Sequence, residues 1–487
     1  MNLNQTLQEK YPHLEVSVLK LSEVREDNES FRIDSEYFKK EYLENEKKLR
    51  NNKMLFEISN TYELHSNGAF KDIYNIIHDN NPKNIGYIES KNIGECFIDG
   101  EVDKISEVAH SLLPKTITKE GDILTARTGK IGGASYVFKE WENCNTNQNV
   151  VNIRLFDDTF SRVFVALFLN TKFGLLQFEK ASTGNVQPWL NLTLLRKIKI
   201  PIFPMSFQLE IEKMVKDSHK ALEESKELYK KAEETLYLEL GLDPKNPLQS
   251  LLDSHTQDST KPLNISIRTL KESFLQTGRL DSEYYQAKYE DIEKMIRSYK
   301  NGFCNLKDLV NDVSSGFAFS SDDYQDTGNL LLIRINNIKN ATLDLDNVVY
   351  LKNEAYNLSP KDKIKKGDIL ISMSGSIGLS CVVRDDVSAM VNQRILKISI
   401  KNFNSDVLVL LLNSFICKMQ FERIGTGGVQ TNLSSIDMQN ILIPKIDSTT
   451  QEKIAKYIQE SFNLRKKSKQ LLDNAKNKVE EQIQGKT

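Results

Sequence analysis

The chain has 487 residues, of which 39% are hydrophobic and 27% are charged. This length exceeds what one hydrophobic core supports and predicts two or three domains. The formal net charge of −2 argues against a protein that binds nucleic acid tightly on its own, because such proteins carry an excess of Lys and Arg. DNA binding together with a partner stays open, since local patches decide more than the sum of charges.

The sequence shows no membrane or secretion signal. No apolar run approaches the ~20 residues that a membrane span needs, and residues 1–10 are polar. The five cysteines are scattered without C-x-x-C spacing, which argues against a disulfide framework and against a zinc site. We therefore expect a cytoplasmic protein that has no membrane partner.

In chain order, the first predicted element is an amphipathic helix that starts at the N-capping pair Asp34-Ser35 and runs to about Leu49. Gly121-Asp122-Ile123-Leu124 predicts a turn that enters a strand, and Gly129-x-Ile131-Gly132 predicts a tight loop that leaves it. A strand rich in Val and Ile is predicted at residues 148–155.

One buried helix is predicted over residues 162–180, followed by a glycine loop at residues 182–187 and a short strand that ends at Pro201. These elements together predict a mixed α/β globule. A long helical stretch, residues 207–240, follows this globule, and a second one spans residues 449–484.

Neither long stretch contains Pro or Gly, and at about 1.5 Å per residue each reaches about 50 Å. Apolar or small residues recur in each at alternating steps of four and three, the pattern of a coiled-coil seam, which Arg465 interrupts in the second stretch. The predicted pairing positions are Ile211, Val215, Leu222, Tyr229 and Leu236 in the first stretch and Ile454, Ile458, Leu472 and Val479 in the second. We expect the two stretches to pair as an antiparallel coiled coil; the alternative is that each packs only on its own globule.

Most of these features occur twice. Ile33-Asp34-Ser35-Glu36-Tyr37-Phe38 recurs as Leu280-Asp281-Ser282-Glu283-Tyr284-Tyr285, and Gly121-Asp122-Ile123-Leu124 recurs as Gly367-Asp368-Ile369-Leu370. The offset between matching residues drifts slowly along the chain, as small loop insertions between two copies of one fold produce. The shared pattern fades at residues 56–108 and 304–356, so each copy has a common frame and a diverged internal segment.

No catalytic motif accompanies the repeat. The Asn/Asp-Pro-Pro-Tyr/Phe tetrapeptide of amino-methyl transfer is missing, and Thr128-Gly129-Lys130 lacks the upstream glycine and the Ser/Thr of a phosphate-binding loop. All six histidines fall within the first 255 residues and have no metal spacing, so no histidine is shared by both copies. The sequence predicts a chain that catalyses no reaction by itself.

The ordered set of motifs, present twice, resembles the specificity subunit of Type I restriction-modification systems over essentially the whole chain. The set comprises the Asp-Ser-Glu-Tyr helix, Gly-Asp-Ile-Leu with its glycine loop, an Asn-Gln strand, a second glycine loop, Ile-Pro and a long helix. The resemblance implies an α+β fold with two tandem target recognition domains separated by an antiparallel pair of long coiled-coil helices, a pseudo-two-fold internal repeat. The corresponding domains are residues 1–204 (first recognition domain), 205–242 (central long helix), 243–262 (linker), 263–446 (second recognition domain) and 447–487 (C-terminal long helix).

In that family each recognition domain reads one half of a split site in double-stranded DNA. The resemblance further implies that the long helices fix the gap between the halves and dock two methyltransferase subunits, which endonuclease/translocase subunits join. S-adenosylmethionine would be held by the methyltransferase partner, so we expect no cofactor in this chain. Joining two readers also multiplies specificity without requiring each to bind tightly.

Candidate DNA contacts follow from residue chemistry. Glycine loops allow backbone N–H groups to approach phosphates, Asn and Gln can read adenine edges, and Arg can read guanine. The candidates are Arg127, Gly129, Lys130, Gly184, Asn185 and Gln187 in the first copy and Arg334, Asn336, Asn337, Gly375, Ser376, Gly427, Gly428 and Gln430 in the second. Arg127 aligns with Met373, so a base read by Arg127 would have to be read differently in the second copy.

Two alternatives stay open. The chain could be the recognition subunit of a Type IIB-like system, whose partner is a single fused nuclease-methyltransferase. It could also be a coiled-coil scaffold whose globules bind proteins instead of DNA.

Overall fold

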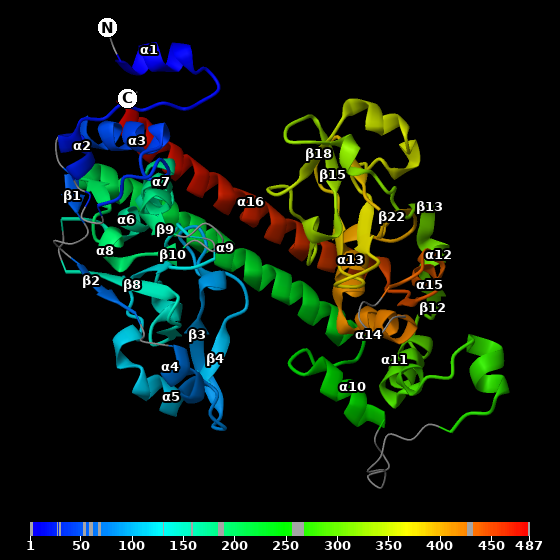
Figure 1. Ribbon diagram of the computed structural model, residues 1–487. Helices are drawn as coiled ribbons and strands as arrows, with labels where there is room; N and C mark the ends of the chain where they lie inside the picture. Colours follow the sequence, from blue (N-terminus) through cyan, green and yellow to red (C-terminus); the bar gives the residue numbers. More distant parts are fainter. Residues whose placement is uncertain are drawn as a thin grey trace. The chain divides into compact units, whose positions relative to one another are not determined.

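The computed structural model describes residues 3–26, 28, 31–51, 55–57, 62–66, 70–129, 131–156, 159–183, 189–255, 267–425 and 432–485. The chain divides into two compact units (Figure 1). Unit 1 comprises Met1–Glu223 and Leu464–Thr487, and unit 2 comprises Glu224–Asn463. Each unit therefore contains part of both long helices. Within the described part of the chain, no helix is both long and apolar enough to cross a membrane.

Unit 1 mixes helices with short strands. Its helices are α1 (Leu3–Lys10), α2 (Leu21–Arg25), α3 (Lys40–Asn51), α4 (Phe70–Ile77), α5 (Glu107–Leu112), α6 (Arg162–Leu169), α7 (Lys172–Ala181), α8 (Leu192–Leu195) and the start of α9 (Met205–Glu239). Its strands are β1 (Leu55–Glu57), β2 (Tyr62–His65), β3 (Lys83–Ile88), β4 (Asp103–Ser106), β5 (Ile123–Ala126), β6 (Ser135–Tyr136), β7 (Asn145–Thr146), β8 (Val150–Leu155), β9 (Ser182–Thr183), β10 (Trp189–Leu190) and β11 (Lys199–Pro201).

Unit 2 is built in the same way. Its helices after α9 are α10 (Pro247–His255), α11 (Ala287–Arg297), α12 (Leu306–Leu309), α13 (Ser405–Asn413), α14 (Phe415–Ile424), α15 (Ser435–Gln439) and the start of α16 (Ser448–Gln484). Its strands are β12 (Phe303–Asn305), β13 (Val310–Ser314), β14 (Tyr324–Gln325), β15 (Leu330–Ile333), β16 (Ile338–Lys339), β17 (Thr342–Leu343), β18 (Val349–Leu351), β19 (Ile369–Ser372), β20 (Ser380–Val382), β21 (Ala389–Val391), β22 (Ile395–Ile400) and β23 (Leu442–Pro444).

The sheets of the two units have matching strand orders. Unit 1 has a sheet β2-β8-β5-β6, and unit 2 has β13-β22-β19-β20. A second sheet, β4-β3-β7 in unit 1 and β14-β18-β15-β21 in unit 2, joins its last two strands in parallel. Strand β1 pairs with β11, and β12 pairs with β23. The two mixed α/β units therefore share one topology, as the repeated motifs predicted, apart from β14, which adds an edge strand to the second sheet of unit 2.

This shared topology continues through the segments in which the sequence repeat fades. Asn92 and Asn337 occupy the same position, because each closes a 3-10 turn just after the central strand of the second sheet. Each is 1% exposed and donates two hydrogen bonds from its side-chain amide to backbone carbonyls of the following loop. The sequence signal was short: only Ile-x-x-x-Asn-Ile, residues 88–93 and 333–338, is common to both copies.

The prediction of one helix over residues 162–180 is wrong, because α6 ends at Leu169 and α7 begins at Lys172. Thr171 causes the break, since its hydroxyl accepts a hydrogen bond from the backbone N–H of Gly174 and caps α7. In unit 2, Ser414 separates α13 from α14 at the matching place, but its hydroxyl donates to the carbonyl of Leu411 and does not cap α14.

The predicted helix start at Asp34-Ser35 is also wrong. Asp34 accepts a hydrogen bond from the backbone N–H of Tyr37, which closes a turn, and α3 begins only at Lys40. The same difference occurs in unit 2, where Asp281 caps a 3-10 turn and α11 begins at Ala287. A capping residue stabilises a first turn but does not decide whether that turn continues as an α-helix.

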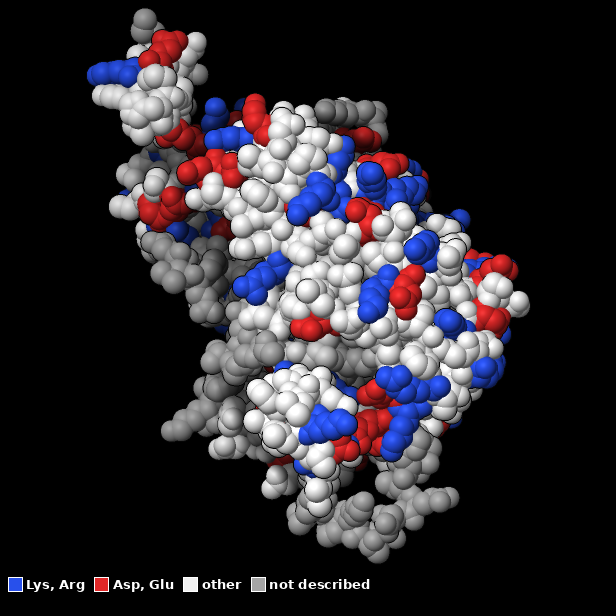
Figure 2. Space-filling model, turned by 90° about the vertical axis from the view of Figure 1, so that its right-hand side faces the viewer, with Lys and Arg blue, Asp and Glu red and all other residues white. Residues whose placement is uncertain are grey.

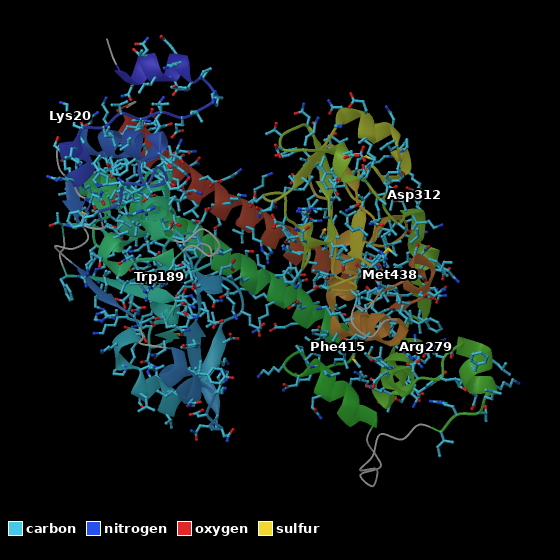
Figure 3. The ribbon with its side chains drawn as sticks, in the orientation of Figure 1. Lys20, Trp189, Arg279, Asp312, Phe415 and Met438 are labelled. Carbon is cyan, nitrogen blue, oxygen red and sulfur yellow. The ribbon has the colours of Figure 1, made fainter. Side chains whose placement is uncertain are left out.

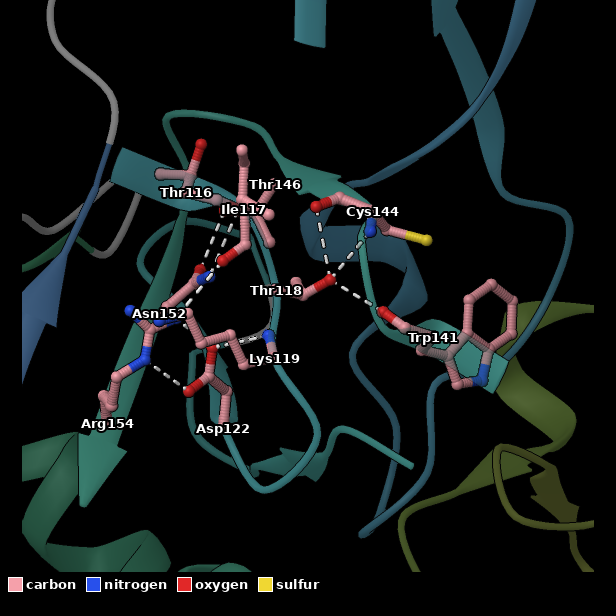
Figure 4. Close-up of polar contacts among 10 residues, drawn as sticks. All are labelled: Thr116, Ile117, Thr118, Lys119, Asp122, Trp141, Cys144, Thr146, Asn152 and Arg154. Atoms are coloured by element: carbon pink, nitrogen blue, oxygen red, sulfur yellow. Dashed lines mark hydrogen bonds and ion pairs between the residues drawn. The ribbon is translucent and has the colours of Figure 1, made fainter. Parts of the chain in front are cut away.

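The Gly-Asp-Ile-Leu motif of unit 1 has a structural role (Figure 4). Asp122 is 2% exposed and accepts hydrogen bonds from Arg154 Nε at 2.8 Å and Arg154 Nη2 at 2.6 Å. Its carboxylate also accepts a hydrogen bond from the backbone N–H of Lys119, which closes the turn before β5. Gly121 adopts φ +92°, and Gly367 in unit 2 adopts φ +93°, a conformation that favours glycine.

The long helices pack against each other within each unit. In unit 1, the hydroxyl of Ser218 donates to the backbone carbonyl of Ser468 at 2.8 Å. In unit 2, the hydroxyl of Ser461 donates to the backbone carbonyl of Ser225 at 2.8 Å. In unit 1, Lys478 of α16 also pairs with Glu210 of α9, so a position nearer the start of α9 matches one nearer the end of α16, and the two helices run antiparallel there. All four serines are buried.

Most of the predicted pairing positions are buried. In unit 1, Ile211, Val215, Leu472 and Val479 belong to one hydrophobic core, against which the partly buried Leu222 packs. In unit 2, the core contains Tyr229, Leu236, Ile454 and Ile458. The helices are therefore part of the core of each unit.

Replacing Ser218 by leucine is expected to lower the free energy of unfolding by about 1–3 kcal/mol, because the added carbons must fit between two closely packed helices. Asp217→Leu is the matched control, since the neighbouring Asp217 side chain is exposed on the same helix. The control should change stability by less than about 0.5 kcal/mol in urea unfolding. Equal effects of the two substitutions would contradict the close packing of the helices.

Candidate nucleic-acid interface

The two glycine loops that follow β5 and β19 have the same backbone geometry. The carbonyl of Gly129 accepts a hydrogen bond from the N–H of Ile131 at 3.0 Å, and the carbonyl of Gly375 accepts one from Ile377 at 2.9 Å. Gly129 has φ +81° and Gly375 has φ +70°, and a Cβ added at either would meet no atom within 4 Å. These first glycines therefore leave open space beside the backbone, as a loop that approaches a phosphate requires.

The last glycine of each loop serves packing. A Cβ added at Gly132 would lie 3.6 Å from Phe178 Cβ, and one added at Gly378 would lie 2.2 Å from Phe421 Cδ2. Both phenylalanines are fully buried. The repeated Gly-x-Ile-Gly motif thus combines one open position with one packed position. Ser376, the predicted contact beside Gly375, is exposed, and its carbonyl accepts a hydrogen bond from the Ser372 hydroxyl.

Arg127 lies at the end of β5, directly before the first glycine loop. Its guanidinium carbon is 4.9 Å from the ring centroid of Trp189. Trp189, labelled in Figure 3, is 40% exposed. The Nε atom of Arg127 is buried and has no hydrogen-bond partner in the described part of the chain. Burial without a facing carboxylate lowers the pKa of Arg127. The Nε donor is therefore unused inside the protein, while the guanidinium end lies beside the exposed ring of Trp189.

The three predicted contacts near β15 have different environments. Asn336 is exposed in the 3-10 turn that follows Arg334. Arg334 is half-buried, and its Nε atom has no hydrogen-bond partner among the described residues. Asn337 is 1% exposed, and its amide is used in hydrogen bonds to Arg334 N, Asp344 O and Asn347 O. These bonds hold the loop, so the Asn337 side chain, a predicted base contact, presents no group at the surface in this structure.

The remaining predicted contacts, Lys130, Gly184, Asn185, Gln187, Gly427, Gly428 and Gln430, lie outside the described residues.

A second repeated feature was not among the predicted sites. Arg32 bonds both oxygens of Asp34 and lies 4.8 Å from the centroid of Tyr37, and Arg279 bonds both oxygens of Asp281 and lies 5.1 Å from the centroid of Tyr284. These hydrogen bonds lower the pKa of both carboxyl groups. The residue between Arg and Asp is turned into solvent in each case: Ile33 is 85% exposed and Leu280 is 69% exposed.

A pocket lies next to this motif in each unit, about 50 Å³ in unit 1 and about 280 Å³ in unit 2. It is lined in each unit by the motif's tyrosine, by a Glu from the following helix and by a cation that pairs with that Glu. These are Tyr37, Glu46 and Lys180 in unit 1 and Tyr284, Glu293 and Arg423 in unit 2. The sequence signal for this feature was the shared motif Arg-Ile/Leu-Asp-Ser-Glu-Tyr. Its second residue is aliphatic, and capping a turn does not require an aliphatic residue there.

Charges of both signs share the surface. On the face shown in Figure 2, Lys and Arg are interspersed with Asp and Glu. That face therefore has no continuous patch of positive charge that would attract a phosphate backbone regardless of sequence.

The described residues contain no group of three or more His, Cys, Asp or Glu side chains that could hold a metal ion. Burial raises the pKa of Cys381 and Cys417 to about 12, so these thiols stay protonated at neutral pH.

A family model described as the Type I restriction modification DNA specificity domain matches residues 41–234 and 300–475. The two matches together cover more than half of the 487 residues, one in each copy of the repeat. The chain belongs to this family. Both copies of the repeat therefore belong to the Type I specificity-domain family by sequence, and they also share a topology.

The chain is 24% identical over 221 residues to the Type I restriction enzyme EcoBI specificity subunit of Escherichia coli. The matched stretch covers 42% of this chain and 46% of that relative, about half of its length.

The chain is also similar to solved structures of Type I specificity subunits. The Type I restriction-modification S subunit from M. genitalium has 14% identity and a TM-score of 0.42, over 88% of this chain and 95% of that chain. The HsdS subunit from Thermoanaerobacter tengcongensis has 14% identity and a TM-score of 0.29, over 89% of this chain and 97% of that chain.

Proposed function

We propose that this chain is the DNA specificity subunit of a Type I restriction-modification complex, in which each mixed α/β unit reads one half of a split target in double-stranded DNA. The observation that carries the proposal is the duplication: the specificity-domain family matches once in each copy, and the two units share one strand order. Two equivalent readers on one chain suit a target with two defined halves.

The paired helices α9 and α16 would fix the gap between the two halves. The buried serine pairs support this role, because hydrogen bonds between small residues hold two helices in one register. A fixed register is what a spacer of constant length needs. The pseudo-two-fold arrangement of the units is part of the same proposal.

The partners would be two methyltransferase subunits, with endonuclease/translocase subunits joining them. The repeated Arg-Ile/Leu-Asp motif supports a partner that binds twice, since the same aliphatic side chain is exposed in both units. S-adenosylmethionine and the methyl-transfer chemistry would belong to the methyltransferase, and this chain would contribute recognition without a catalytic step. A cytoplasmic location fits such a complex.

The pairing of β1 with β11 provides the test. Leu55 lies opposite Pro201, and in unit 2 Phe303 lies opposite Pro444, so the two ends of each recognition segment are adjacent. Residues 55–201 are replaced by residues 303–444 of the same chain, and the product is expressed with its methyltransferase subunit. Methylated adenines are then mapped across a genome.

The wild-type complex should give a split motif with two different constant halves. The chimera should give a split motif whose halves are both the unit 2 half, one on each strand, with methylation otherwise retained. The reverse chimera, with two unit 1 segments, is the matched control. An unsplit wild-type motif, or a chimera that changes both halves, would overturn the proposal.

The same experiment separates the alternatives. Co-purification with one fused nuclease-methyltransferase would indicate a Type IIB-like system. A protein scaffold would show no sequence-dependent DNA binding, even with the methyltransferase present.

A further inference from the structure

Three backbone segments meet in the same way in both units. In unit 1, Arg127 N donates to Asn149 O at 2.7 Å, and Leu190 N donates to Arg127 O at 2.8 Å. In unit 2, Met373 N donates to Arg394 O at 2.9 Å, and Leu433 N donates to Met373 O at 2.9 Å. Isolated bridges join Thr128 to Trp189 and Ser374 to Asn432.

These bonds define three equivalent positions, which we call the triad. The triad consists of Arg127, Asn149 and Trp189 in unit 1 and of Met373, Arg394 and Asn432 in unit 2. Each triad contains one arginine, but at a different position: the first in unit 1 and the second in unit 2. A sequence comparison pairs Arg127 with Met373 and therefore misses that the charge is kept.

Each arginine is oriented by the third member of its triad. The Arg127 guanidinium lies over the exposed ring of Trp189, with its carbon 4.9 Å from the ring centroid. Arg394 is exposed and donates from Nη1 to Asn432 Oδ1 at 2.8 Å. The ring of Trp189 and the amide oxygen of Asn432 are chemically different, but each holds its arginine's guanidinium in one orientation.

The surroundings of the two arginines differ from those of other arginines in the chain. Among the described residues, no carboxylate forms an ion pair with Arg127 or Arg394, whereas Arg32, Arg154, Arg279 and Arg423 each have one. Arg394 also has φ +73°, a backbone conformation that costs free energy for a residue with a Cβ. Strain of this kind at an exposed, unneutralised cation points to a binding role.

We propose that Arg127 and Arg394 are equivalent guanine-reading side chains, each of which donates to the major-groove edge of one guanine in its own half of the target. This inference rests on the proposed function of the chain. An oriented guanidinium suits guanine because its two parallel N–H donors match the O6 and N7 acceptors, whereas a phosphate accepts from a mobile Lys equally well. The open glycine positions next to each triad, Gly129 and Gly375, allow DNA to come close.

The test uses the full chain in complex with its methyltransferase subunit. Arg127→Met, Arg127→Lys, Arg394→Met and Arg394→Lys are compared by genome-wide adenine methylation mapping and by binding to the wild-type target duplex. Arg196→Met is the control, because Arg196 is an exposed arginine of unit 1 outside the triad. Affinity for the target should fall about 10–100-fold in all four triad variants, since Lys keeps the charge but loses the two parallel donors.

The methylation motif gives the decisive result. Arg127 variants should lose selectivity for one guanine in one half of the motif, and Arg394 variants should do so in the other half. In each variant the unaffected half shows that the protein is folded. A triple variant gives unit 2 the triad of unit 1 (Met373→Arg, Arg394→Asn, Asn432→Trp). Its methylation motif should still require the guanine in the half that unit 2 reads.

Three outcomes would overturn the inference. Rescue by Lys with an unchanged motif would identify a phosphate contact, and a motif altered in both halves would identify a structural role. Binding and motif unchanged in the Met variants would exclude DNA contact. An unsplit motif in the wild type would instead remove the proposed function itself, and this inference with it.

Discussion

Replacing Gly316 by alanine is expected to destabilise unit 2 by more than about 3 kcal/mol, at the upper end of what single substitutions do. Gly316 has φ +76°, and an added Cβ would lie 2.0 Å from the carbonyl oxygen of Asn392. This neighbour cannot move away cheaply, because the Asn392 N–H donates to Ile333 O at 2.9 Å and so joins β21 to β15. The substitution must therefore separate two strands of a sheet.

Gly302→Ala is the matched control for this prediction. Gly302 has φ +75°, and an added Cβ would meet nothing within 4 Å. Only the conformational cost of a positive φ applies there, about 1–2 kcal/mol. Hydrogen-exchange protection of β15 and β21 should fall steeply in the Gly316 variant and change little in the Gly302 variant; similar losses in both would show that the close approach does not matter.

A second large loss of stability is expected at one of two equivalent aspartates, Asp122 in unit 1 and Asp368 in unit 2. Asp122→Asn should destabilise unit 1 by about 3 kcal/mol, because Arg154, which is 18% exposed, loses its carboxylate. Asp368 is the equivalent residue of unit 2, and Ser399 stands at the position of Arg154. We expect Asp368→Asn to change stability by less than about 1 kcal/mol, since the amide oxygen still accepts the hydrogen bond from Lys365 N.

The effect of Asp368→Asn should also depend on pH. Burial raises the pKa of Asp368 above its ordinary value, so the folded state favours the neutral carboxyl group. The stability that the neutral form contributes is present in acid and is lost as pH rises through the folded pKa. Asp368→Asn should therefore be relatively more stable than wild type at pH 7 than at pH 3. Hydrogen exchange of β19 across this range measures the effect, and a gain confined to acid would contradict it.

The sequence alone predicted the frame of each unit well. The Gly-Asp-Ile-Leu turns, the strands after them and both long helices were predicted because each depends on local chemistry: glycine at positive φ, alternating β-branched residues, or a seam repeated every seven residues. The helix breaks at Thr171 and Ser414 were missed, since a Ser or Thr inside an apolar run does not by itself predict a break. The Thr171 hydroxyl caps the next helix, whereas the Ser414 hydroxyl donates back to the carbonyl of Leu411.

The candidate contacts were harder to predict. Asn337 was nominated for its amide, but whether an amide faces DNA or holds a loop depends on backbone carbonyls up to ten residues away. Arg394 was not nominated, because its equivalence to Arg127 exists only in three dimensions. The neighbouring motif Asn392-Gln393, shared with Asn147-Gln148, was the one sequence signal that marked this place.

The antiparallel strand pairs β1–β11 and β12–β23 have a consequence for inheritance. Because the two ends of residues 55–201 lie side by side, as do those of residues 303–444, we expect that exchanging such a segment between related genes leaves the helices outside it intact. Each pair has only three residues per strand, so foreign partners need to agree over a short junction. Under the proposed function, such an exchange would replace one half of the DNA target in one step, without waiting for point mutations to build a new half.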